Sequence, residues 1–211
     1  IAFPDTRAIY LKENRTWLKK INQNWAQFIN NTSDGKYKYT LDDKNGDVYS
    51  QTLIHEIRHT NPDNGNLPDL LSEADADYTA MEQIARARGD SALIQEMIWN
   101  TALAGDFDEN HNTVLYLHLK FNKQAIPSAE DLRQANSDAA PVLQNLRKVY
   151  VDILEDDTSS EAKELKKSFD DAVKNLSPLA RLRVEIYQQA WENCVRPVQQ
   201  SALARLASIM K

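Results

Sequence analysis

Two histidines and a glutamate in the first third of the chain have the spacing of half a metal site. His55, Glu56 and His59 spell H-E-x-x-H. If this segment is helical, residues four apart lie above one another on one face, so both imidazoles can reach one metal ion with Glu56 beside them. A catalytic zinc site still needs another ligand, because it holds the ion through three protein groups and leaves the fourth position to water.

A third ligand for that ion is available fourteen positions after His59. Glu73 begins an E-x-x-A-D sequence that ends at Asp77, and two histidines with one glutamate are a known zinc ligand set. Asp77 shares a helix face with Glu73 and can accept the second ring N–H of a ligating histidine, which fixes its tautomer. Asp75 is a competing carboxylate, but it points to another side of the helix. The sequence therefore predicts zinc held by His55, His59 and Glu73.

Together the two patterns resemble those of the gluzincin metallopeptidases. The sequence E-x-x-A-D from Glu73 to Asp77 is most similar to that of the HtpX and CAAX-prenyl-protease family, and the E-x-x-A-[ND] of ImmA/IrrE-like peptidases is close to it. The resemblance covers residues 47–88. It implies a zincin-like fold and a zinc metalloendopeptidase that hydrolyses peptide bonds of a protein or peptide substrate.

The resemblance also implies a role for each residue in hydrolysis. The zinc ion polarises the scissile carbonyl and lowers the pKa of its bound water toward about 7. Glu56, beside the metal rather than on it, is the general base that passes the water proton to the leaving amine. Gluzincins stabilise the tetrahedral intermediate with a His or Tyr further along the chain. The candidates are His111, His118 and Tyr78, and His111 leads because it lies in a polar loop.

Other readings fit the same residues. A protein-interaction or regulatory module can keep a metal-binding zincin fold with little turnover, although a purely structural zinc site does not need the general base Glu56. An ImmA/IrrE-like regulatory protease that cleaves or senses a repressor would act in the cytoplasm. Without a metal, the histidines are surface residues of an amphipathic helix, and the acids of the second pattern favour a helix dipole.

Composition places the chain among ordinary soluble globular proteins. Its 211 residues suffice for one well-buried core, and 42% of them are hydrophobic against 27% charged. A net charge of −6 without a long Lys/Arg block argues against nucleic acid as a partner. No apolar run approaches the ~20 residues of a transmembrane segment. The chain begins at Ile1, as signal-peptide removal would leave it, which favours a periplasmic or secreted bacterial protein over a cytoplasmic one.

Apolar periodicity predicts a mainly α (α+β) protein. Helical spacing recurs in four segments of the first half of the chain: residues 7–30, 48–60, 72–88 with Ser72 as cap, and 91–104. Residues 36–41 alternate with period two and predict a short strand before the metal-binding helix, an edge that can pair with extended substrate. The run 113–121 fits either a strand or a buried helix, and periodicity does not choose between them.

Helical signals continue to the end of the chain. Ser128 is a predicted cap, and Ser177, followed by a proline, opens a final helix that Pro197 should interrupt. We therefore expect a zincin-like metallopeptidase core over residues 1–125 and a helical extension over residues 126–211 that packs on this core.

Overall fold

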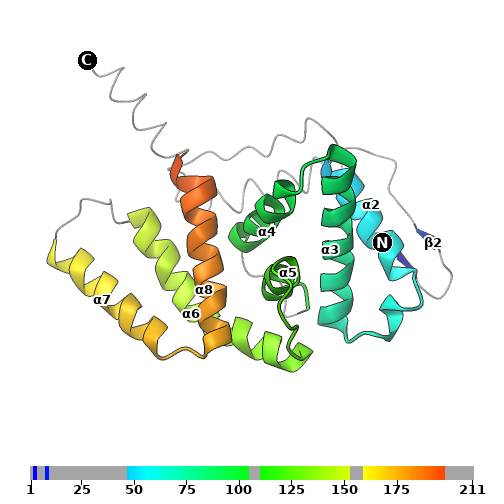
Figure 1. Ribbon diagram of the computed structural model, residues 1–211. Coiled ribbons are helices and arrows are strands. Elements are labelled where there is room, and N and C mark those ends of the chain that lie inside the picture. The colour runs from blue at the N-terminus through cyan, green and yellow to red at the C-terminus, as the bar shows by residue number, and fades with distance from the viewer. Residues whose placement is uncertain (1, 4–7, 10–46, 105–109, 153–158, 198–211) are drawn as a thin grey trace, which may run out of the picture.

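The computed structural model describes residues 2–3, 8–9, 47–104, 110–152 and 159–197, and their architecture is mainly helical (Figure 1). In chain order the elements are β1 (Ala2–Phe3), β2 (Ala8–Ile9), α2 (Asp47–His59), the 3₁₀-helix η1 (Asn64–Asn66), α3 (Asp69–Arg88), α4 (Ala92–Ala104), α5 (Val114–Phe121), α6 (Ala129–Asp152), α7 (Ser160–Lys174), α8 (Pro178–Ala190) and the π-helix η2 (Trp191–Val195). This confirms the mainly α class. None of the described helices combines the length and apolar composition that crossing a membrane requires.

The two strands near the N-terminus are short and, among the described residues, form a two-stranded sheet. β1 and β2 are antiparallel, with Ala2 opposite Ile9 and Phe3 opposite Ala8. The prediction of a helix over residues 7–30 is therefore wrong at residues 8–9, where local backbone pairing replaces helical hydrogen bonds. The rest of that segment, and the predicted strand over residues 36–41, lie outside the described residues.

Helix α5 lies at the centre of the helical assembly. It contacts α3, α4, α6 and α8, and Val114, Leu115, Leu117 and Leu119 are all buried. A helix that is apolar almost all round is buried almost all round, which is why its sequence shows no clear period. The helical alternative holds because a helix pairs its backbone groups internally, whereas a strand in this position would need neighbouring strands.

One hydrophobic cluster joins helices from both halves of the sequence. Buried Val184 and Tyr187 of α8 belong to the same cluster as Leu70 and Met81 of α3, and α8 packs on α4, α5 and α6. Helix α7 covers α6 at one end of the molecule, and α2 packs along α3 at the other end (Figure 1). Of the helices after residue 126, α6 and α8 thus pack on helices that precede residue 126, and α7 packs on α6.

Local sequence explains the start of α8 but not the start of α3. The hydroxyl of Ser177 accepts a hydrogen bond from the Ala180 N–H, as predicted for an N-cap. In contrast, α3 begins at Asp69 directly after Pro68, and the Pro68 carbonyl accepts from the Ser72 N–H at 2.9 Å. The prediction that Ser72 caps this helix is wrong, because the helix starts one turn earlier, with Pro68 as its N-cap residue.

The final helix changes geometry before Pro197, the residue predicted to interrupt it. Helix α8 ends at Ala190, and the π-helix η2 continues to Val195. Pro197 has no N–H for a helical hydrogen bond, and its ring crowds the preceding turn. A turn of wider spacing just before a proline is one way to relieve that conflict.

Of the two glycines among the described residues, Gly89 should be the more sensitive to substitution. It ends α3 with φ 66°, in the left-handed region, although an added Cβ would meet no atom within 4 Å. We expect Gly89→Ala to lower the free energy of unfolding by about 1 kcal/mol through backbone strain alone. Gly65→Ala is the matched control, because its Cβ also meets nothing within 4 Å and its φ is not positive. Urea denaturation of both variants measures the difference, and equal stabilities would contradict this account.

Candidate metal centre

Helices α2 and α3 run side by side in opposite directions (Figure 1), and the predicted ligand atoms approach one another across their contact. His55 Nε2 lies 3.0 Å from His59 Nε2. Glu73 Oε2 lies 3.2 Å from His55 Nε2 and 3.3 Å from His59 Nε2. All three residues are half-buried, and among the described residues they form the group of side chains able to hold a metal ion. The structure therefore brings the three predicted ligands together.

The triangle of ligand atoms has the size that a tetrahedral zinc ion requires. Zinc at ~2.0–2.2 Å from each ligand separates neighbouring ligand atoms by roughly 3.3–3.6 Å in tetrahedral geometry. The edges between His55, His59 and Glu73 measure 3.0, 3.2 and 3.3 Å, so only a small outward shift is needed. Two histidines and one glutamate also match the ligand number of a catalytic site, which keeps a fourth position for water. These residues fit zinc.

Asp77 orients the first histidine. Its Oδ1 lies 2.8 Å from His55 Nδ1, one helical turn beyond Glu73 on the same face of α3. The second oxygen, Oδ2, accepts a hydrogen bond of 2.8 Å from the Thr113 hydroxyl. The carboxylate therefore holds the proton on Nδ1 and turns Nε2 toward the triangle, as a metal-binding tautomer requires.

Two residues that the sequence analysis did not predict as partners of a ligand lie beside the second histidine. His59 Nδ1 lies 3.3 Å from Ser72 Oγ and 3.3 Å from the amide nitrogen of Asn64. Asn64 is fully buried, and its Oδ1 has no hydrogen-bond partner among the described residues. Turning the amide by 180° makes that oxygen an acceptor for Nδ1–H, which is the bond a ligand coordinated through Nε2 needs. Ser72 directly precedes Glu73 in sequence. A predicted helix start before residue 72 would have placed Ser72 inside the helix beside a ligand, where its contact with His59 could have been considered.

Opposite charges stabilise one another inside the triangle. Burial by itself lowers the pKa of His55, but the hydrogen bonds and negative charges of Asp77 and Glu73 outweigh it and raise that pKa to about 10. Burial raises the pKa of Glu73, yet hydrogen bonds from His55 and His59 outweigh this and hold it well below its usual range. Glu73 is therefore an ionised ligand, and at neutral pH a proton competes with a metal for His55.

Of the two predicted catalytic residues, Glu56 lies between the two histidine ligands in sequence, and His111 follows Glu73. His111 Nε2 is 3.6 Å from Glu73 Oε2, and about half of its side chain is exposed (53%). It is not one of the mutually close ligands, so it flanks a ligand oxygen rather than completing the triangle. Glu56 directly follows His55 in α2 and is partly buried.

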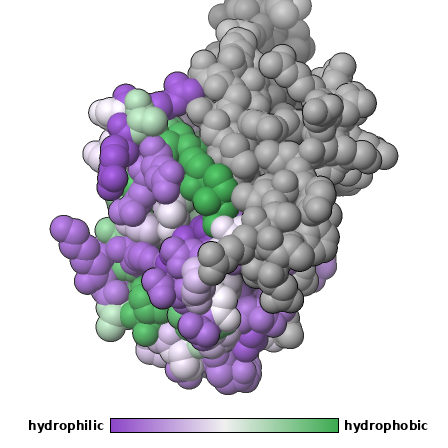
Figure 2. Space-filling view, turned by 90° about the vertical axis from the view of Figure 1, so that its right-hand side faces the viewer, coloured by the Kyte–Doolittle hydropathy of each residue, from purple (hydrophilic) through white to green (hydrophobic). Residues whose placement is uncertain are grey.

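Figure 2 shows the side of the molecule on which α2 lies, where hydrophobic residues form a band within a largely hydrophilic surface.

The remaining candidates have other partners among the described residues. His118 lies near the end of α5, with its Nε2 3.2 Å from the Asn122 amide, and burial lowers its pKa. The ring of Tyr78 is buried and lies 4.9 Å from the Lys120 ammonium. The Asp75 carboxylate accepts hydrogen bonds of 2.7 Å from both Arg58 and Lys120. These contacts favour His111 over His118 and Tyr78, and Glu73 over Asp75.

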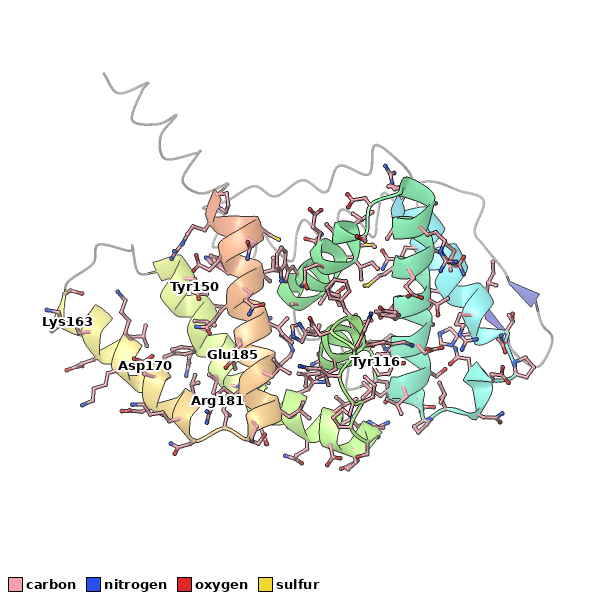
Figure 3. The ribbon with its side chains drawn as sticks, viewed as in Figure 1. Tyr116, Tyr150, Lys163, Asp170, Arg181 and Glu185 are labelled. Atoms are coloured by element: carbon pink, nitrogen blue, oxygen red, sulfur yellow. The ribbon has the colours of Figure 1, made fainter. Side chains whose placement is uncertain are left out.

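Asp75 instead joins the three helices that surround the centre. Arg58 reaches it from α2 and Lys120 from α5, and Lys120 also donates to the Tyr116 hydroxyl at 3.0 Å. Figure 3 shows Tyr116 extending from α5 toward α3. Lys120 and Arg58 hold the pKa of Asp75 below its usual range despite the opposing effect of burial. This ionic group stabilises the position of α2 against α3.

Metal uptake should release a proton. At pH 7 His55, with its pKa of about 10, carries a proton that zinc must displace, so roughly one proton should leave per zinc bound. The apparent affinity should rise with pH and level off near pH 10. Calorimetric titrations in buffers of different ionisation enthalpy measure the number of protons released. His55→Ala should abolish tight binding, whereas zinc uptake by wild type without proton release would contradict the proposed state of His55.

Replacing Asp75 should destabilise the fold without removing a ligand. Asp75→Asn leaves Arg58 and Lys120 partly buried without their carboxylate. We expect the free energy of unfolding to fall by about 2–4 kcal/mol, somewhat less than the ~3–5 kcal/mol typical of fully buried pairs, because Lys120 is one-third exposed (33%). Thermal and urea denaturation measure the loss. Asp171→Asn, at an exposed ion pair with Lys174, is the control and should cost less than about 1 kcal/mol.

Comparisons of the chain with protein-family models, with curated protein sequences and with solved structures found no match. The chemical assignment of this centre therefore depends on its own residues and their geometry.

Proposed function

We propose that the protein is a zinc-dependent metalloendopeptidase of the gluzincin type, with a zincin-like core, that hydrolyses peptide bonds of a protein or peptide substrate. The observation that carries this proposal is the triangle of His55 Nε2, His59 Nε2 and Glu73 Oε2, with edges of 3.0–3.3 Å. Its support is the orientation of both histidines through Nδ1, by Asp77 on one and by Ser72 and Asn64 on the other.

The mechanism assigns a separate task to each residue. His55, His59 and Glu73 would hold a zinc ion, which would supply Lewis acidity to polarise the scissile carbonyl and to lower the pKa of the attacking water toward about 7. Glu56 accepts the proton of the attacking water and passes it to the leaving nitrogen, so the peptide C–N bond breaks without a covalent enzyme intermediate. His111 donates its ring N–H to the carbonyl oxygen as negative charge develops there.

The position of His111 supports this division of labour. Its Nε2 lies 3.6 Å from a ligand oxygen, near enough to reach a group bound beside Glu73 but outside the set of mutually close ligands. A donor in this position stabilises the transition state without occupying the water position. Its exposure of 53% leaves it accessible from solvent, which a residue that meets an incoming peptide requires.

Glu56→Gln is the variant that separates catalysis from metal binding. The amide cannot accept the water proton, so we expect hydrolysis of an unfolded casein-like substrate to fall by at least ~100-fold while zinc content and stability stay unchanged. Glu96→Gln, an exposed position on α4, is the matched control and should cleave as wild type does. Zinc is measured by elemental analysis, and cleavage is assayed with and without a chelator.

One result would contradict the proposed mechanism, and another would contradict the proposed enzymatic function. Full activity of Glu56→Gln with zinc bound would exclude Glu56 as the base. A folded, zinc-loaded wild type that cleaves nothing across a broad peptide library would instead indicate a metal-binding interaction or regulatory module.

A further inference from the structure

The loop that carries His111 is tied to the metal centre through Thr113. The Thr113 side chain is almost completely buried (1% exposed), and its hydroxyl donates to Asp77 Oδ2 at 2.8 Å. Its backbone N–H donates to the His111 carbonyl at 3.0 Å. One residue thus holds both the carboxylate that orients His55 and the backbone of His111.

The hydroxyl of Thr113 does not serve the ordinary purpose of its position. Thr113 is the N-cap residue of α5, where a threonine hydroxyl usually accepts from a backbone N–H of the first turn. No such side-chain capping bond is present at this helix. The hydroxyl is directed at Asp77 instead, so its partner belongs to the metal centre and not to α5.

Helix α6 holds the same loop from the opposite side. The buried Asn136 (6% exposed) donates from Nδ2 to the Asn112 carbonyl at 2.8 Å. Arg133, one turn earlier, donates to Asn110 Oδ1 at 3.2 Å. The residues before and after His111 are therefore bonded to a helix that lies beyond residue 126 in the sequence.

We propose that Thr113 and Asn136 are positioning residues that clamp the loop of residues 110–113 between α3 and α6 and thereby hold His111 beside Glu73. The inference rests on the proposed function, in which His111 acts on the substrate. The clamp has two unequal arms. Thr113 acts on the ligand His55, through Asp77, and on the loop, whereas Asn136 acts on the loop alone.

This asymmetry predicts different effects for the two arms. Thr113→Val keeps the side-chain shape and removes the hydroxyl, so it should weaken zinc binding by roughly 10-fold or more, the scale of lost outer-shell hydrogen bonds. It should also lower kcat. Asn136→Ala should leave zinc affinity within about 3-fold of wild type and lower kcat by roughly 10-fold or more with little change in KM, because a displaced catalytic group loses transition-state stabilisation.

The experiment compares wild type, Thr113→Val, Thr113→Ser, Asn136→Ala and Thr101→Val. Thr113→Ser keeps the hydroxyl and should restore both zinc affinity and kcat. Thr101→Val is the matched control, since within the described part of the chain the Thr101 hydroxyl donates to the Met97 carbonyl of its own helix at 2.9 Å. Zinc affinity is measured by competition with a chromophoric chelator. The ring ¹⁵N signals of His55 and His111 report the geometry independently of activity.

The outcomes separate the clamp from the proposed function. Shifted ring signals of both His55 and His111 in Thr113→Val, and of His111 alone in Asn136→Ala, support the clamp even if no substrate is cleaved. A wild type that binds no zinc would overturn the metallopeptidase. A zinc-loaded, active wild type with Thr113→Val indistinguishable from Thr101→Val would overturn the clamp alone. If Thr113→Val does not fold, Asn136→Ala against wild type decides by the His111 signal.

Discussion

The contact between α2 and α3 is the constraint on which the rest of this structure depends. Neither helix carries a complete metal site, because the histidines lie on one and the carboxylates on the other. Beside the approach of the predicted ligands, two ionic contacts join α2 to α3: His55 with Asp77 at 2.8 Å and Arg58 with Asp75 at 2.6 Å. Partly buried charges need such partners, because unpaired charge away from water is costly. The same pairing that makes burial tolerable therefore sets the distance between the ligands.

Helix α5 connects the polar contact between α2 and α3 to the hydrophobic core. Its sequence is apolar over most of its length, and it packs among α3, α4, α6 and α8. Polar groups occur at both ends of it. Thr113 reaches Asp77 at the start, and Lys120 reaches Asp75 one residue before the last. A rigid, buried helix thus supports the ligand-bearing helix α3 at two points about two turns apart, which limits how far α3 can rotate.

The helices after residue 126 contribute to the centre without supplying a ligand to it. Their apolar faces complete the core through α8, and the polar face of α6 reaches the loop beside His111 through Asn136 and Arg133. Catalytic geometry requires positions accurate to a fraction of an ångström, and residues on helices hold such positions better than a loop does alone. A loop tied to two helices combines exposure to solvent with that accuracy, and the proposed function requires both.

Sequence alone determined the features that depend on short-range periodicity. The spacing of His55 and His59 predicted that both imidazoles can reach one ion, because helical geometry fixes which residues share a face. Glu73, on the other helix, was predicted from its E-x-x-A-D pattern and from the known set of two histidines and one glutamate. The serine cap of α8 was likewise predicted, since it acts on a neighbouring backbone group. Tertiary structure alone decided the helical state of α5, the approach of Asn64 and Ser72 to His59, and the bonds of the 110–113 loop. Each of these features depends on contacts between residues that are far apart in sequence and share no helical period. Packing between distant elements therefore determines them.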